Sequence, residues 1–344
     1  MMRFAALLMF SAGAFAASAV DIDTAANIYL EAQVREQVRA SLASMPKQIR
    51  DMFSRDASAQ LDAQELDAVN EAAKRGFRID VFETPALSAL AQNLDAATVA
   101  KTHAFLESDL GKRMVAADVA SATMGEANID KVMSGQLMAP STPKRDALID
   151  QLEHATRSTE STVDIFLSMG QAVAIGTAIG SGLDQNSVAE RARKSGEASR
   201  AGLEHDMRLP MRRFLAYSYR NLSDSDLKHL VAFLESPAGT RYVTAYNAAM
   251  GAGYDAMGRR TGEQLGESLR ELAQAKLEPP PDDRLPPDIA APQPPQTGPQ
   301  SAPVPPAVPA PPAVPAPPAA PAPAPQGAPA SPPGPAATPS APQH

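Results

Sequence analysis

Few residues in this 344-residue chain could carry catalysis or hold a metal, since it has five histidines and no cysteine. The lack of cysteine excludes disulfides and thiolate metal sites. His103 and His229 lack the His-Glu-x-x-His spacing that brings two imidazoles to one metal. Glu204-His205-Asp206 has suitable residue types, but adjacent residues on a helix point in different directions. We therefore favour solvated or capping histidines and expect no metal.

Serine and phosphate chemistry have equally little support. The sequence has no Gly-x-Ser-x-Gly elbow and no phosphate-binding loop followed by Lys-Ser or Lys-Thr. Three Ser-x-x-Lys matches, of which Ser44-Met-Pro-Lys47 is the first, lack the companion motifs of penicillin-interacting enzymes. We expect no cofactor and favour a protein that is not an enzyme, while an envelope hydrolase with an unrecognised site stays open.

One set of charged residues occurs twice at the same spacing. The phrase HAFLESDLGKRMV, from residue 103, is closely copied as VAFLESPAGTRYV from residue 231, so that Glu107 and Arg113 correspond to Glu235 and Arg241. General acid–base catalysis would need a cleft that shifts a carboxyl pKa. The sequence indicates no such cleft, and we favour a Glu–Arg pair that braces a helix corner in each copy over a paired-carboxylate site.

Each copy predicts a corner between two helices. Ser236 is the expected N-cap of the second helix, and Pro237 is its first residue, where a missing N–H costs nothing. Gly239 falls in the first turn, where glycine is unfavourable by about 1 kcal/mol relative to alanine. Close contact between the helices is the expected compensation. The residues expected to form the two corners are Phe105, Glu107, Ser108, Gly111 and Arg113 in the first copy, and Phe233, Glu235, Ser236, Pro237, Gly239 and Arg241 in the second.

The copy extends beyond the corner. Between residues 93–115 and 221–243, ten of 23 aligned positions are identical, whereas random pairing would give about two. Further upstream, Asp62 and Asp184 are expected to cap corresponding helices. Gly76 and Gly202 are expected to lie where those two helices stop.

No convincing β-strand interrupts these helix signals. The sequence therefore predicts an all-α fold of two related helical units, residues 20–138 and 144–274, produced by tandem duplication. Each unit is long enough to bury most of its apolar surface alone. The two units either fold separately or share one core.

The two ends of the chain have different compositions from its body. Residues 1–19 carry one early arginine, a short apolar run and small residues, which is typical of a signal peptide. The apolar run is too short to cross about 30 Å of hydrocarbon. We predict export with cleavage after Ala16 or Ala19 and a periplasmic location. Secretion from the cell is the second possible location. The alternative to cleavage is that residues 1–19 remain as an N-terminal anchor.

Residues 279–344 consist mainly of Pro, Ala, Gln, Ser and Gly. Proline donates no backbone hydrogen bond and alanine has little apolar area to bury, so packing cannot offset the entropy lost on ordering. We predict a disordered, proline-rich tail that serves as a spacer or tether.

Residues 165–183 form the longest uncharged stretch in the body of the chain. Ala172, Gly176 and Gly180 recur every four residues, so that one helix face would allow close packing or face a membrane. We favour a central helix buried by both units over a membrane-inserting or oligomerising segment, because glutamine, serine and glycine make this stretch a poor bilayer span.

The net charge of −8, without a basic stripe, argues against a nucleic-acid partner. An envelope protein or a cell-wall component is the expected partner, although no residue identifies it. The sequence gives no oligomeric state.

The segment from Leu222 to Gly239, LSDSDLKHLVAFLESPAG, resembles the signature of the bacterial DUF2059 family. The resemblance is best over residues 147–273 and weaker in the first copy, where Asp109-Leu110 replaces Pro-Ala. It implies a secreted, helical protein of unknown biochemical role and assigns no catalytic residue. Our leading hypothesis is a non-enzymatic binding or scaffold module, and the alternative is a periplasmic carrier or chaperone of an apolar ligand held against the glycine-rich helix.

Overall fold

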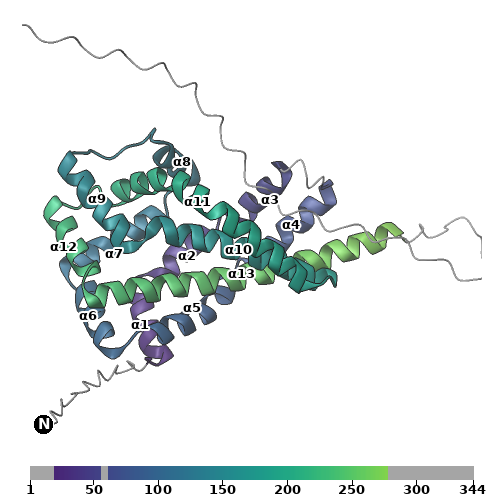
Figure 1. Cartoon of the computed structure of the whole chain (residues 1–344), viewed down its shortest axis with the longest axis horizontal. Helices are drawn as coiled ribbons and strands as arrows, with labels where there is room; N and C mark the ends of the chain where they lie inside the picture. Colours follow the sequence, from purple (N-terminus) through teal and green to yellow (C-terminus); the bar gives the residue numbers. More distant parts are fainter. Residues whose placement is uncertain (1–18, 56–60, 278–344) are drawn as a thin grey trace, which may run out of the picture. The chain divides into compact units, whose positions relative to one another are not determined.

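The computed structural model describes residues 19–55 and 61–277, and within these ranges every regular element is a helix (Figure 1). The all-α prediction is therefore confirmed. Nearly all of the predicted signal peptide and the whole predicted tail lie outside the described residues. In chain order the helices are α1 (Ile22–Glu31), α2 (Val34–Leu42), α3 (Met45–Arg55), α4 (Ala63–Gly76), α5 (Ile79–Asn93), α6 (Ala96–Leu106), α7 (Asp109–Ala122), α8 (Glu126–Ser134), α9 (Pro143–Thr156), α10 (Ser158–Ser181), α11 (Gln185–Ser218), α12 (Asp224–Leu234) and α13 (Pro237–Leu277).

Local caps define where most of these helices begin. Asp62 accepts from the backbone N–H of Glu65, and the Glu65 side chain accepts from the N–H of Asp62, which completes a capping box at α4. Asp95 caps α6, Asp184 caps α11 and Ser223 caps α12 in the same way, through side-chain oxygens that accept from first-turn N–H groups.

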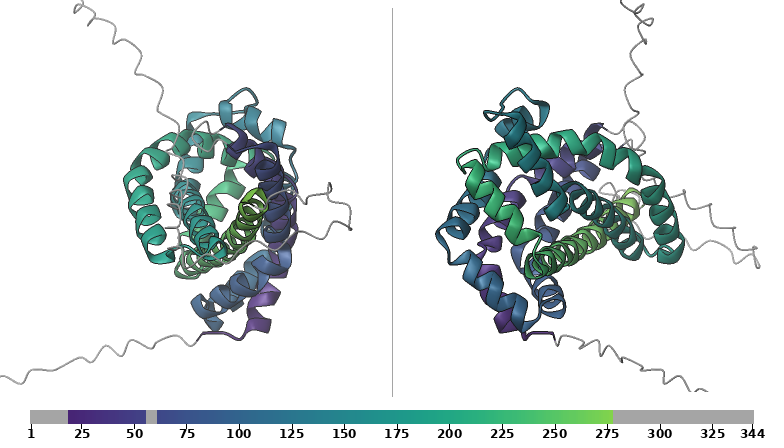
Figure 2. Two further views of the ribbon diagram at one scale, coloured as in Figure 1. Left: turned by 90° about the vertical axis from the view of Figure 1, so that its right-hand side faces the viewer. Right: turned by 60° about the vertical axis from the view of Figure 1, so that its left-hand side comes forward.

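The C-terminal helix α13 organises the described part of the chain. It is 41 residues long and packs against α4, α5, α6, α9, α10 and α12. Figure 2 shows α13, in green, seen nearly along its axis with helices from early and late in the chain around it. Gly253 of α13 lies against the Phe82 ring of α5, and Gly76 of α4 lies against Thr261 of α13.

One hydrophobic core includes residues of both predicted units. Phe82 and Leu94 from the first half belong to the same buried cluster as Leu227 and Met257 from the second half, and all four side chains are fully buried. Of the two arrangements that the sequence allows, the described residues adopt the shared core.

The expected helix end at Gly202 is wrong. Helix α11 runs without a break from Gln185 to Ser218, and Gly202 lies near its middle. A glycine costs a helix only about 1 kcal/mol, and here the chain continues the helix on both sides. Gly76, by contrast, is the last residue of α4, as expected.

The expected central position of the glycine-rich helix is also wrong. Helix α10 packs on α13 and α11, both from the second half of the chain, rather than between the two halves. Only 28% of its most apolar window is buried, and Phe166 and Ile179 are exposed. Among the described helices, α10 alone has the length and composition to cross a membrane.

Candidate functional site

The two predicted corners have the same hydrogen bonds. The Ser236 hydroxyl accepts from the N–H of Gly239 at 3.1 Å and donates to the carbonyl oxygen of Phe233 at 2.6 Å. In the first copy, Ser108 accepts from Gly111 at 3.0 Å and donates to the carbonyl of Phe105 at 2.6 Å. Each serine therefore ends one helix and begins the next.

Glycine is required at both corners by close approach of the preceding helix. A Cβ at Gly239 would lie 2.0 Å from the carbonyl oxygen of Phe233, and a Cβ at Gly111 would lie 2.0 Å from that of Phe105. Each contact involves backbone, which cannot swing aside as a side chain can. Pro237 is the first residue of α13, and Asp109 occupies the same place in α7.

The two corners meet each other. The rings of Phe105 and Phe233 are stacked. Arg113 of the first corner binds Asp226 in the first turn of α12 at 2.6 Å. Arg241 of the second corner binds Asp95, the cap of α6, at 3.0 Å. The arginines thus connect the copies reciprocally.

The expected Glu–Arg pair within each corner is wrong. Glu107 binds Lys112 at 3.0 Å, and Arg113 is directed to the other copy. No ion pair joins Glu235 to Arg241 within the described ranges. Each arginine side chain is long enough to reach the other copy, where it binds a carboxylate at a helix N-terminus: Asp226 in the first turn of α12, or Asp95 at the cap of α6. Both carboxylates also interact favourably with the positive end of the helix dipole.

The small-residue face of α10 is covered by a matching face of α13. A Cβ at Gly176 would lie 2.2 Å from the carbonyl oxygen of Arg259, and one at Gly180 would lie 2.2 Å from that of Glu263. From the other side, a Cβ at Gly262 would lie 2.1 Å from the carbonyl of Val173. Ala172 is also buried and contacts the position of Gly258.

The sequence of α13 contains a signal for this pairing. Gly258, Gly262 and Gly266 recur every four residues in α13, the same spacing as in α10. Two helices with matched small-residue spacing can bring their backbones together over several turns.

A groove opens where α10, α11 and α13 diverge. Its volume is about 640 Å³, and its lining is mixed in polarity. The groove exists because small residues line it, such as Gly196 of α11 and Gly251 of α13. Arg200 forms an ion pair with Asp164 across the groove. The lining residues are Arg157, Ser161, Asp164, Ile165, Leu167, Ser168, Gln171, Ala192, Arg193, Gly196, Glu197, Arg200, Asn247, Ala248, Gly251, Ala252 and Asp255.

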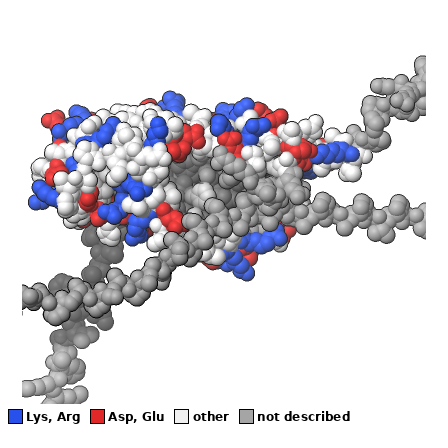
Figure 3. Space-filling model, turned by 90° about the horizontal axis from the view of Figure 1, so that it is seen from above, with Lys and Arg blue, Asp and Glu red and all other residues white. Residues whose placement is uncertain are grey.

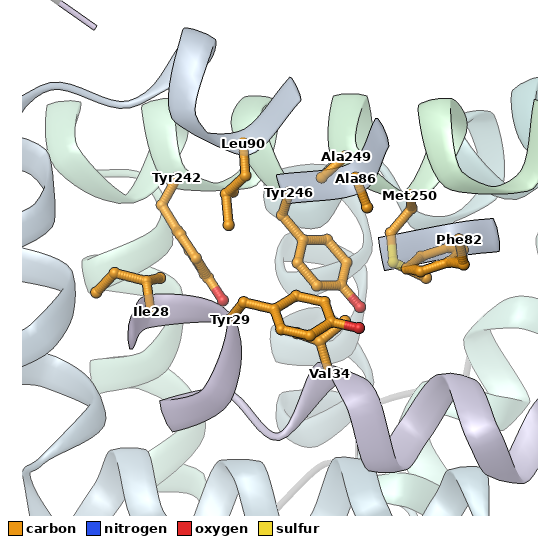
Figure 4. A pocket seen from close by; sticks show the side chains of 10 residues that line it. All are labelled: Ile28, Tyr29, Val34, Phe82, Ala86, Leu90, Tyr242, Tyr246, Ala249 and Met250. Atoms are coloured by element: carbon orange, nitrogen blue, oxygen red, sulfur yellow. The ribbon is translucent and has the colours of Figure 1, made fainter. Parts of the chain in front are cut away.

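A second cavity is enclosed but very small, with a volume of about 10 Å³. Tyr29, Tyr242 and Tyr246 point into it beside Phe82 and Leu90 (Figure 4). This volume is about that of one water-sized probe.

A carboxyl–phenol pair that the sequence did not indicate joins α7 to the end of α11, with Tyr219 buried and Asp118 partly buried. The Tyr219 hydroxyl donates to Asp118 at 2.6 Å, and burial raises the pKa of Asp118 to about 7 despite this hydrogen bond. The two residues are 101 positions apart, and neither lies in a recognisable motif. Raised carboxyl pKa values occur at functional sites, which makes this pair a second candidate.

The histidines do not assemble a metal site in the described part of the chain, where no cluster of three or more ligand-type residues occurs. His103 instead binds Glu31 at 2.8 Å, and this hydrogen bond raises the pKa of the imidazole. On the face shown in Figure 3, acidic and basic side chains are interspersed without a patch of one sign.

Comparison with protein families gives one finding. A family model described as "Uncharacterized protein conserved in bacteria (DUF2059)" matches residues 211–268, which include the second corner and the glycines of α13. The comparisons with curated proteins and with solved structures gave no match. Over residues 211–268, the chain is therefore similar to the bacterial DUF2059 family.

Proposed function

We propose that this chain is an exported bacterial envelope protein that acts as a non-enzymatic binding module. Its helical body arose by tandem duplication, and its Pro-rich C-terminal segment serves as a tether. The observation that carries the binding role is the groove between α10, α11 and α13. Its volume of about 640 Å³ lies within the usual range of ligand sites.

The lining of the groove suits a polar partner segment rather than a lipid. Ile165 and Leu167 provide apolar contact, while Ser161, Gln171 and Asn247 provide hydrogen-bonding groups. The groove also includes charges of both signs. A peptide segment or loop of another envelope protein presents this mixture of groups.

The carrier alternative has less support. The enclosed cavity of about 10 Å³ is far too small for an apolar ligand. The glycine-rich face of α10, which a ligand was expected to contact, is occupied by α13. Membrane attachment through α10 would likewise require this helix to separate from α13.

Duplication is supported by the agreement of the two corners. Their serine hydrogen bonds differ by no more than about 0.1 Å, and their glycines are confined by the same backbone atom of the preceding helix. Reciprocal Arg113–Asp226 and Arg241–Asp95 pairs are the relationship expected if both copies descend from one unit that once associated with itself.

Site-specific crosslinking in intact cells tests the binding role. Because the chain has no cysteine, single Gly196→Cys and Gly251→Cys variants can carry a photocrosslinker in the groove. Neither side chain would clash there. The matched control is Gly202→Cys, which is exposed on α11 outside the groove.

We expect both groove positions, but not position 202, to capture the same envelope protein. Equal capture from all three, or none, would contradict the binding role. N-terminal sequencing of the mature protein and carbonate extraction of membranes test the export and attachment alternatives independently.

A further inference from the structure

Asp118 and Tyr219 connect two distant parts of the chain. Asp118 lies on α7, and Tyr219 is the C-cap of α11. The phenol donates to the carboxyl at 2.6 Å. Tyr219 is only 8% exposed, and Asp118 is partly buried.

Within the described ranges, no positively charged side chain forms an ion pair with Asp118. Tyr219 is its hydrogen-bond partner, and Tyr242 and Tyr246 of α13 interact with it at longer range. Helix α7 also packs against α2 and α6. The charged residues of those two helices are Arg35, Glu36, Arg39, Lys101 and His103, and the last turns of α11, which α7 also contacts, carry Arg208, Arg212 and Arg213. None of these residues forms an ion pair with Asp118 among the described residues.

Two effects on Asp118 oppose each other. Removal from water disfavours the ionised carboxyl, while the hydrogen bond from Tyr219 favours it. Burial is the larger effect, so the pKa of Asp118 rises to about 7 from its usual value of 3.8. The carboxyl group is therefore protonated in the closed structure over a pH range in which an exposed aspartate is ionised.

The C-terminal end of α11 is also held by α9. Arg145 of α9, which is 12% exposed, donates to the carbonyl oxygen of Tyr219 at 2.7 Å and to that of Leu222 at 2.9 Å. These bonds fix the position of Tyr219. The N-terminal half of α7 is held by the Arg113–Asp226 ion pair and by the buried Val115, so a separation from Tyr219 has to come from the half of α7 that carries Asp118.

We propose that Asp118 and Tyr219 form a pH-sensitive latch between α7 and the end of α11, closed when the carboxyl group is protonated and loosened when it ionises. The ionised group reaches water by moving α7 away from Tyr219. This opening does not depend on what the groove binds.

The first test is NMR titration of the full chain, in which the Asp118 carboxyl signal is assigned by its loss in Asp118→Asn. We expect a titration midpoint near neutral pH. In Tyr219→Phe, which removes the hydrogen bond but keeps the ring, the midpoint should move up, since that bond lowers the pKa. A midpoint near that of ordinary aspartate, or a downward shift in Tyr219→Phe, would overturn the latch.

The second test measures movement. Spin labels at Ala116→Cys on α7 and His205→Cys on α11 occupy exposed positions, and the chain has no other cysteine. We expect the distance distribution to broaden or lengthen between about pH 5 and pH 8. The Asp118→Asn substitution keeps a neutral acceptor for Tyr219. In the labelled chain that carries it, the distance distribution at pH 8 should remain the one seen at pH 5. An unchanged distance across this range, or the same pH response in Asp118→Asn, refutes the proposal.

Discussion

The rings of Phe105 and Phe233 stack with centroids 3.9 Å apart and planes 3° from parallel. These residues hold the same position in the two corners, so the stack joins equivalent points of the two copies. The arginine of each corner then binds an acidic residue at the N-terminus of a helix in the other copy. The same substitution can therefore be made at equivalent positions of the two corners, and its effects on stability can be compared.

Replacing Gly239 with alanine should destabilise the protein by about 2 kcal/mol, because the added Cβ meets the Phe233 backbone and the clash outweighs the gain in helix propensity. Gly111→Ala should behave alike. Gly202→Ala is the control: its Cβ would meet nothing within 4 Å, and it should be neutral or slightly stabilising. Denaturant unfolding measures all three, and equal stability of Gly239→Ala and Gly202→Ala would contradict the corner geometry.

Gly262→Ala should separate α10 from α13 and lower the melting temperature by several degrees, since its Cβ would lie 2.1 Å from the carbonyl oxygen of Val173. Gly170→Ala, on α10 but with nothing within 4 Å of its Cβ, should not. Differential scanning calorimetry distinguishes the two. Equal melting temperatures for Gly262→Ala and Gly170→Ala would contradict the close contact between α10 and α13.

Arg241→Ala should cost about 1 kcal/mol of unfolding free energy, because Arg241 binds Asp95 and also donates to the carbonyl oxygen of Asn93 at 3.1 Å. Arg113→Ala should cost less, since Arg113 is more exposed and makes one such contact. Chemical unfolding at two salt concentrations checks this order. A larger loss of unfolding free energy for Arg113→Ala than for Arg241→Ala would contradict this prediction.

Asp118→Asn should reduce the dependence of stability on pH. The folded pKa of Asp118, about 7, exceeds that of an unfolded aspartate. Between the two values the folded protein holds a proton that the unfolded chain has lost, so this carboxyl makes the protein less stable as pH rises from about 4 to about 7. At pH 8 the variant should be more stable than the wild type, by an amount on the order of 2 kcal/mol.

The opposite sign is expected for the capping carboxylates. Backbone hydrogen bonds at Thr98 lower the pKa of Asp95, so its contribution is present above the unfolded pKa and is lost in acid. Asp95→Asn should therefore lose stability at neutral pH. Unfolding curves collected from pH 3 to about pH 8 compare the two variants, and parallel behaviour would contradict the assignment.

Features that depend on neighbours in sequence were predictable. The Asp62–Glu65 capping box and the Ser236–Gly239 bond each join residues three apart, so their types and spacing suffice. The prediction of a helix end at Gly202 used the same local reasoning and was wrong. A glycine ends a helix only when the residues after it also leave the helical conformation.

Features that depend on tertiary packing were not predictable from one sequence. Nothing near Phe82 indicates that its ring lies on Gly253, and nothing near Asp118 indicates Tyr219. The ion-pair partner of Arg113 was likewise not predictable, because it depends on which acidic residue the fold brings within reach of the side chain. Only the matched glycine spacing of α10 and α13 offered a long-range signal.

The place of α13 in the chain has a consequence for biogenesis. It is the last helix to be synthesised in the described part, yet Phe82 and Gly76, from the first third of the chain, obtain their burial from it. Lys276, at its far end, is bound to Asp62 and Glu65. The early helices consequently cannot complete their packing before α13 has been synthesised. A nascent chain must therefore remain incompletely folded until residue 277 has been added.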